Sequence, residues 1–239
     1  MSKPKTKEHI LLPEQIDKIN KNIKSSEEDF VFNSLLNSGL RISEFVHLRK
    51  TWINFNRNLI KVPESEKCSC KGCEYKRLQV LRKQKSFVKD VNDEIEESTY
   101  RGRTRRRKKR NKLSAHQEMV LKGYWVPKTK ASIRTIPVVP EAQEVLYPFF
   151  KQYKKVQDVY PWRQYVNNIL NKLSKRSKIK IFPHCLRGTF ATMLATKGFD
   201  AFEITDVMGW SDINVAIFYI KLSGTVLKNA FEEKWSRKY

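Results

Sequence analysis

The sequence predicts a mainly helical α+β fold with one small antiparallel sheet. Most of the chain shows apolar residues at helical spacing, as in Ile16, Ile19 and Ile23. Stretches that alternate like strands are few and short, and they occur at residues 52–55, 59–62, 123–126 and 133–139. A hydrophobic content of 40% is sufficient for a packed core.

The first third of the chain predicts three helices and a hairpin. Residues 1–10 are polar, and we expect a flexible N-terminus. Pro13 begins the first helix, since its fixed φ suits the first turn. A second helix over 27–38 ends at Gly39, and a third begins at Arg41. Polar residues then predict a turn between the strands at 52–55 and 59–62.

The last part of the chain predicts a run of helices. The first begins at Pro140 and Glu141, where proline and an acidic residue favour a helix start. The apolar spacing places the helices at about 141–155, 161–174, 184–197, 201–208 and from 212 onward. Residues 225–238 have the amphipathic pattern of a final helix.

The composition indicates a polyanion as partner. The formal net charge is +23, and a soluble protein this basic usually meets nucleic acid. No apolar run reaches the ~18 residues that span a bilayer, and the N-terminus lacks a secretory apolar stretch. Three of the four cysteines lie close together, which favours reduced thiols over a disulfide framework. We therefore expect a cytoplasmic, DNA-associated protein.

Four residues have the chemistry of a metal-free attack on a phosphodiester. His184 and Arg187 are three residues apart and share one helix face. Arg41 supplies a second guanidinium, and paired arginines bind phosphate oxygens. Tyr219, nine residues after Trp210, supplies a nucleophile. Neither a phosphate-binding glycine loop nor an acidic two-metal cluster stands out, so we expect no nucleotide and no catalytic metal.

These motifs resemble those of the tyrosine recombinase, or phage integrase, family. The chain shows GLRISE where the family has its first arginine box, HCLRGTFAT for its His-x-x-Arg box and VMGWSDINVAIFYI for its tyrosine box. A fourth segment, PKTKASIRTIP, resembles the β-hairpin that carries the family's catalytic lysine. The resemblance covers about 11–62 and 121–235. It implies a recombinase catalytic domain over 11–239, interrupted by an insertion at 64–120.

The resemblance implies a site-specific recombinase that cleaves and rejoins DNA through a 3′-phosphotyrosyl intermediate. Arg41 and Arg187 would bind the scissile phosphate, and Tyr219 would attack it. His184 would accept the tyrosine proton or hydrogen-bond the phosphate. Trp210 stands where many relatives have a second histidine, and its indole N–H donates but cannot shuttle a proton.

A lysine of the predicted hairpin would protonate the 5′-oxygen that leaves. Lys128 fits the family pattern better, and Lys130 is the alternative. Arg134 would contact the DNA backbone, and Glu44, one turn after Arg41, would orient a group of the active site. The alternative for Glu44 is an ordinary carboxylate on a helix surface.

The implied partner is double-stranded DNA, which the protein would bind as a homotetramer. The implied source of the protein is a virus or another mobile element. Residues 225–238 would dock on a neighbouring protomer or pack on their own domain. Two other functions stay open: a type IB topoisomerase-like nicking and rejoining enzyme, and a DNA-binding protein with an inactive recombinase fold. All expected catalytic positions are filled, which argues against the latter. The family's separate DNA-clamp domain is absent, or the chain is a fragment.

The insertion at 64–120 departs from the family pattern. Nine of the twelve residues at 101–112 are basic, and such a block repels itself until it meets phosphate. We expect the insertion to strengthen the binding of the protein to DNA. Cys68, Cys70 and Cys73 supply three thiols, and tetrahedral zinc needs four ligands. His116 is the candidate fourth ligand of a structural zinc, ahead of His47 and Cys185, and the alternative is a cysteine-rich turn without metal.

Overall fold

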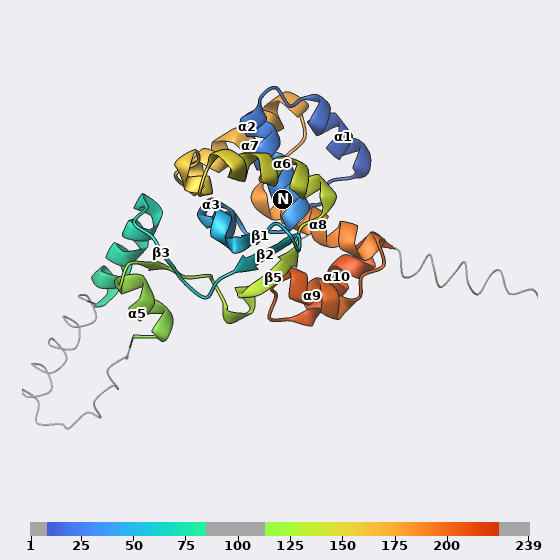
Figure 1. Ribbon diagram of the computed structural model, residues 1–239. Helices are drawn as coiled ribbons and strands as arrows, with labels where there is room; N and C mark the ends of the chain where they lie inside the picture. Colours follow the sequence, from blue (N-terminus) through green and yellow to red (C-terminus); the bar gives the residue numbers. More distant parts are fainter. Residues whose placement is uncertain (1–8, 85–112, 225–239) are drawn as a thin grey trace, which may run out of the picture. The chain divides into compact units, whose positions relative to one another are not determined.

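The computed structural model describes residues 9–84 and 113–224 (Figure 1). The chain forms two compact units, Glu64–Val126 and the remainder on either side of it, Met1–Pro63 with Pro127–Tyr239. The predicted helix at 225–238 and the basic block at 101–112 lie outside the described residues. Among the described residues, no helix is long and apolar enough to cross a membrane.

The larger unit has the predicted mainly helical α+β architecture. Its helices are α1 (Pro13–Lys21), α2 (Ser26–Ser38), α3 (Ile42–His47), α6 (Pro140–Gln152), α7 (Arg163–Ser177), α8 (Pro183–Thr196), α9 (Ala201–Met208) and α10 (Ile213–Ser223). Its sheet has the order β1 (Ile53–Asn54), β2 (Leu59–Val62) and β5 (Arg134–Pro137), with both strand pairs antiparallel. The fold class predicted from the sequence is confirmed.

Helix α2 is the central helix of one core. It packs against α6, α7 and α8, and its side chains Phe32, Leu35 and Leu36 are buried. The Ser25 hydroxyl accepts a hydrogen bond from the Glu28 amide and caps the helix start. At the other end Gly39 adopts the left-handed conformation predicted for a helix stop.

A second core joins α8, α9 and α10. Phe190 and Leu194 from α8 meet Ile204 and Met208 from α9 and Ala216 from α10. Helix α10 packs against both other helices, and α9 also packs against β5 (Figure 1). This arrangement places α9 beside the small sheet and packs α8 and α10, which carry Arg187 and Tyr219, against α9.

The smaller unit has its own secondary structure. Strands β3 (Glu66–Lys67) and β4 (Tyr124–Trp125) form a two-stranded antiparallel sheet. Residues 71–84 are helical, and α5 (Ala115–Leu121) begins at Ser114 with a reciprocal capping box to Gln117.

Residues 127–137 do not form the hairpin that they resemble. The stretches 123–126 and 133–139, predicted as strands, contain β4 and β5, but β4 pairs with β3 and β5 pairs with β2. The backbone groups of β4 are therefore used within the smaller unit. Pro127 follows, which has no N–H to donate, and Lys130–Ser132 forms a 3-10 turn. Lys128 lies in the loop between strands of two different sheets.

Gly39 provides a test of how tightly the two cores meet. A Cβ there would lie 2.7 Å from the Phe190 ring and 2.9 Å from the Met208 sulfur, at a φ of 59°. Gly39→Ala should therefore lower the free energy of unfolding by more than the ~1–2 kcal/mol of a left-handed residue alone. Urea unfolding measures the loss. Gly224→Ala is the matched control, because its φ is 65° and a Cβ there would have no atom within 4 Å. If both variants lost the same free energy of unfolding, the packing around Gly39 would have to relax to accept the methyl group.

Candidate active site

Three arginines distant in sequence converge on the C-terminus of α9. The Val207 carbonyl accepts a hydrogen bond from Arg134 Nε at 2.7 Å, and the Gly209 carbonyl accepts one from Arg41 Nη2 at 2.7 Å. Between them, the Met208 carbonyl accepts a hydrogen bond from Arg187 Nη2. Three consecutive carbonyls thus each bind a different guanidinium.

The local geometry of α9 explains this convergence. The last carbonyls of a helix have no partner within the helix and carry partial negative charge. Gly209 turns the chain with a φ of 60°, and a Cβ at this position would lie 2.6 Å from the Ala131 carbonyl oxygen. The left-handed turn and the close approach of the loop both require glycine.

Glu44 is the carboxylate at the centre of the arginines. Its side chain is 1% exposed and forms ion pairs with Arg41 at 2.8 Å and with Arg134 at 3.1 Å. Burial alone would raise the pKa of Glu44, but the charge and hydrogen bond of Arg134, then Arg187 and Arg41, lower it below the ordinary value. Glu44 therefore orients two guanidiniums, as the sequence suggested for an active-site group, and is not a surface carboxylate.

Two residues have roles that the sequence did not indicate. Arg134, expected on the DNA backbone, is buried and donates to Val207, Glu44 and the Ser132 carbonyl. The Ser132 hydroxyl accepts a hydrogen bond from Arg41 Nη1 at 3.0 Å and is itself fully buried. A lone serine in a short turn gave no sequence signal for this role.

Arg187 is 5% exposed, and its two Nη groups donate to the Gly39 and Met208 carbonyls. Burial, followed by the charges of Arg41 and Arg134, lowers the pKa of Arg187 well below its ordinary value. The arginine nevertheless retains N–H groups beyond these two bonds, because a guanidinium carries five. An anion is the ligand that would relieve the accumulated positive charge.

Tyr219 packs beside Arg187. Its ring stacks on Trp210, with centroids 5.4 Å apart, and the Arg187 guanidinium lies 5.7 Å from the Trp210 ring centre. A Cβ placed on Gly188 would lie 3.0 Å from the Tyr219 hydroxyl, so the hydroxyl faces the α8 backbone next to Arg187. Burial raises the pKa of Tyr219 more than Arg187 lowers it. The resting tyrosine is protonated at neutral pH.

His184 and Lys128 are the two predicted catalytic residues that are exposed to solvent. His184 reaches solvent in the first turn of α8, and Lys128 is exposed in its loop. Partial desolvation, then the charges of Arg187, Lys128 and Arg41, lower the pKa of His184. The imidazole is therefore neutral at pH 7, and the structure brings all six predicted catalytic residues into one region.

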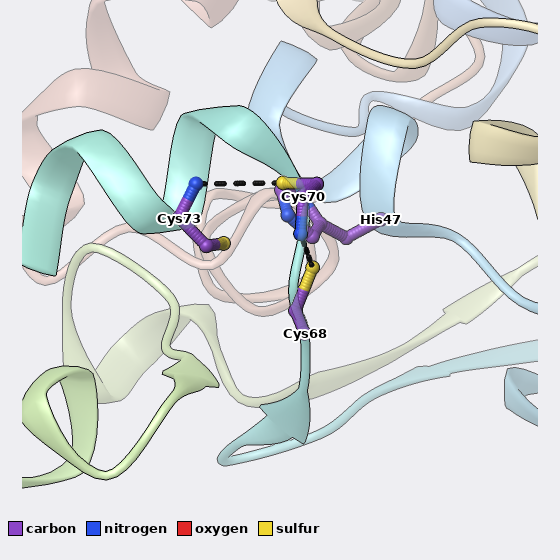
Figure 2. A group of neighbouring side chains, drawn as sticks. All are labelled: His47, Cys68, Cys70 and Cys73. Atoms are coloured by element: carbon purple, nitrogen blue, oxygen red, sulfur yellow. Dashed lines mark hydrogen bonds between the residues drawn. The ribbon is translucent and has the colours of Figure 1, made fainter.

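The three clustered cysteines lie together in the smaller unit. Their sulfur atoms are within 4.8 Å of one another, and Cys73 is buried (Figure 2). The four cysteines, all among the described residues, form no disulfide. Cys185 is fully buried in α8, as expected for a core residue of the His-x-x-Arg motif.

The sequence as a whole assigns the class of protein that this geometry suggests. Residues 9–225 match the model of the phage integrase family. The chain belongs to this family. The resemblance found in the four motifs is thereby confirmed over nearly the whole chain.

Curated relatives of the chain are archaeal. The tyrosine recombinase XerA of Thermococcus onnurineus is 25% identical over 236 residues, which are 96% of this chain and 64% of the relative. XerA of Pyrococcus furiosus is 23% identical over 232 residues, which are 96% of this chain and 63% of the relative. The chain thus spans slightly less than two thirds of both.

Solved structures share the fold. A Tn1549 transposon integrase in complex with a circular intermediate DNA superposes with a TM-score of 0.59 at 18% identity, covering 96% of this chain and 67% of that one. A XerA recombinase crystal structure gives a TM-score of 0.56 at 13% identity, covering 96% and 64%. At these identities the similarity is one of fold.

Glu44→Gln tests the buried charge network. Removing one partner of a buried pair costs about 3–5 kcal/mol, so the variant should lose this free energy of unfolding at neutral pH. The pKa of Glu44 is lower in the folded chain, so its contribution is present above the unfolded pKa of about 4.3 and is lost as the pH falls. Chemical unfolding from pH 7 to pH 3 measures the difference between the two proteins.

The matched control is Glu14→Gln, which removes an exposed carboxylate from the first turn of α1. This change should cost no more than a few tenths of a kcal/mol. If the difference in free energy of unfolding between Glu44→Gln and the unmodified protein did not become smaller as the pH falls, the proposed charge pairing would be contradicted.

Proposed function

We propose that the protein is a tyrosine-type site-specific recombinase that cleaves and rejoins double-stranded DNA through a 3′-phosphotyrosyl intermediate. The observation that supports the proposal is the placement of Tyr219 beside a cluster of three arginines that backbone carbonyls hold in place. The XerA relatives are named tyrosine recombinases, and the Tn1549 integrase was solved with DNA. A mobile element as the source and a homotetramer on DNA are parts of the proposal.

The arginine cluster would bind the scissile phosphate. Three guanidiniums surround a single carboxylate, Glu44, so the site carries excess positive charge before DNA arrives. The carbonyls of residues 207–209 hold the arginines in place, so little reorganisation is needed when charge develops on phosphorus. Donors fixed in this way lower the barrier by roughly 3–4 kcal/mol each.

The nucleophilic step follows from the protonation states of two residues. The Tyr219 oxygen forms a bond to phosphorus while the bond from phosphorus to the 5′-oxygen breaks. The tyrosine proton must leave during attack, because burial keeps the pKa of the hydroxyl above its ordinary value. The neutral imidazole of His184 is the acceptor for that proton.

The leaving 5′-oxygen needs a proton, for which Lys128 is the donor we favour over Lys130. The charge of Lys128 contributes to the lowered pKa of His184, so the two groups lie within electrostatic range. Rejoining is the reverse of the cleavage reaction: a 5′-hydroxyl attacks the phosphotyrosyl ester, and the Tyr219 oxygen leaves. The ester conserves the bond energy, so neither a nucleotide nor a metal is required.

Covalent capture tests the proposed nucleophile. A duplex library with randomised flanks and a nick near the centre lets the cleaved fragment diffuse away and traps the protein on DNA. The unmodified chain should give an adduct that survives a denaturing gel, and sequencing the trapped DNA identifies the target. Tyr219→Phe should give no adduct, because the attacking oxygen is missing.

The matched control is Tyr165→Phe, which changes a tyrosine that is 40% exposed and lies on α7. It should form the adduct at the unmodified rate. DNA binding without any adduct in the unmodified chain would favour a DNA-binding protein with an inactive recombinase fold.

The general acid is tested with a sulfur-substituted substrate. Lys128→Ala should slow cleavage by about 10²–10⁴-fold, the usual contribution of general acid catalysis. Replacing the bridging 5′-oxygen by sulfur should restore the rate, since a thiolate leaves without a proton. Single-turnover kinetics on the captured sequence measures both. If the sulfur-substituted substrate restored the cleavage rate of Lys130→Ala and not that of Lys128→Ala, Lys130 would be the general acid.

A further inference from the structure

The cysteine cluster has no part in the proposed strand transfer, although its geometry is well defined. Cys68 follows β3, and its amide donates to the Gly123 carbonyl beside β4 at 3.0 Å. Cys70 directly precedes the helical residues 71–84, and Cys73 lies in their first turn. A strand end and a helix start thus place three thiols within a six-residue segment.

Backbone amides already point at two of the sulfur atoms. The Cys70 amide donates to Cys68 Sγ at 3.5 Å, and the Cys73 amide donates to Cys70 Sγ at 3.4 Å (Figure 2). Such N–H···S bonds stabilise sulfur that carries negative charge, as a metal-bound thiolate does. Outer partners of this kind fix the orientation of metal ligands.

The distances between the sulfur atoms fit a tetrahedral metal ion. Bonds of ~2.3 Å from zinc to sulfur place tetrahedral ligands ~3.8 Å apart. The three sulfur atoms lie within 4.8 Å of one another, so movements of about 1 Å bring them to that spacing.

The smaller unit also has few buried apolar residues to stabilise it. Within its described part, the buried hydrophobic side chains are Cys73, Val120 and Trp125. A small unit whose described part has so small a core normally needs a disulfide, a metal or another staple. The cysteines form no disulfide, so a metal is the staple that these residues can provide.

We propose that Cys68, Cys70 and Cys73 bind a structural zinc ion as thiolates, with a histidine imidazole as fourth ligand. The candidates are His116, which lies in α5 of the same unit, and His47, which the sequence also offers. The Nδ1–H of His47 donates to the Ser43 carbonyl at 2.7 Å. Metal-binding histidines are commonly oriented in this way.

The alternative for the same residues is a thiol–disulfide pair. Cys70 and Cys73 have the C-x-x-C spacing at the start of a helix that redox proteins use. The third thiol and the N–H···S bond to Cys68 favour a metal, since a redox pair needs neither.

The experiment uses the full chain, purified without chelators. Elemental analysis should find one zinc ion per chain, and added cobalt(II) should give thiolate-to-cobalt charge transfer with the strong visible bands of a tetrahedral site. Each of Cys68→Ser, Cys70→Ser and Cys73→Ser should weaken zinc binding by more than about 100-fold, the largest effect expected from loss of an outer partner alone. Cys185→Ala, the matched control, should bind zinc unchanged.

The fourth ligand is assigned by comparing His47→Ala with His116→Ala, of which one should weaken zinc binding and the other should not. Cobalt spectra of the unmodified chain remain informative if a cysteine variant fails to fold. Absence of zinc and of thiolate charge transfer would overturn the proposal. A disulfide between Cys70 and Cys73, detected by mass spectrometry of the untreated protein, would overturn it in favour of a redox pair.

Discussion

The structure depends on the capping of one helix end by three arginines. The carbonyls of residues 207–209 would be unsatisfied at the C-terminus of α9, and Arg134, Arg187 and Arg41 each bind one of them. These arginines come from a strand, a helix and a helix start that are far apart in sequence. The hydrogen bonds that cap the end of α9 therefore also bring the positive charges of the site together.

This arrangement resolves a conflict between stability and function. Burying several like charges is costly, and Glu44 offsets only part of that cost. Helix-end carbonyls contribute further negative potential without a net charge, so the site keeps its excess positive charge for a phosphate. Trp210 directly follows the end of α9, and the ring of Tyr219, which lies in α10, stacks on it, so the same helix end positions the proposed nucleophile.

The sequence predicted the helices well because apolar spacing is a local signal, and the motif boxes indicated the family because they too are local. The family and the fold class were confirmed by comparison and by structure. Three features were not predictable: the Ser132 hydroxyl under Arg41, the structural role of Arg134, and the pairing of β4 with β3. Each depends on contacts between distant segments, and Glu66–Lys67 shows no alternation that marks it as a strand.

A crystal structure of the Tyr219→Phe chain bound to its target duplex would test most directly whether the end of α9 builds the site. We predict one phosphate within ~3 Å of the guanidiniums of both Arg41 and Arg187. The arginines should keep their bonds to the carbonyls of residues 208 and 209. A scissile phosphate bound elsewhere, or arginines that abandon the end of α9 to reach it, would contradict the claim that this helix end builds the site.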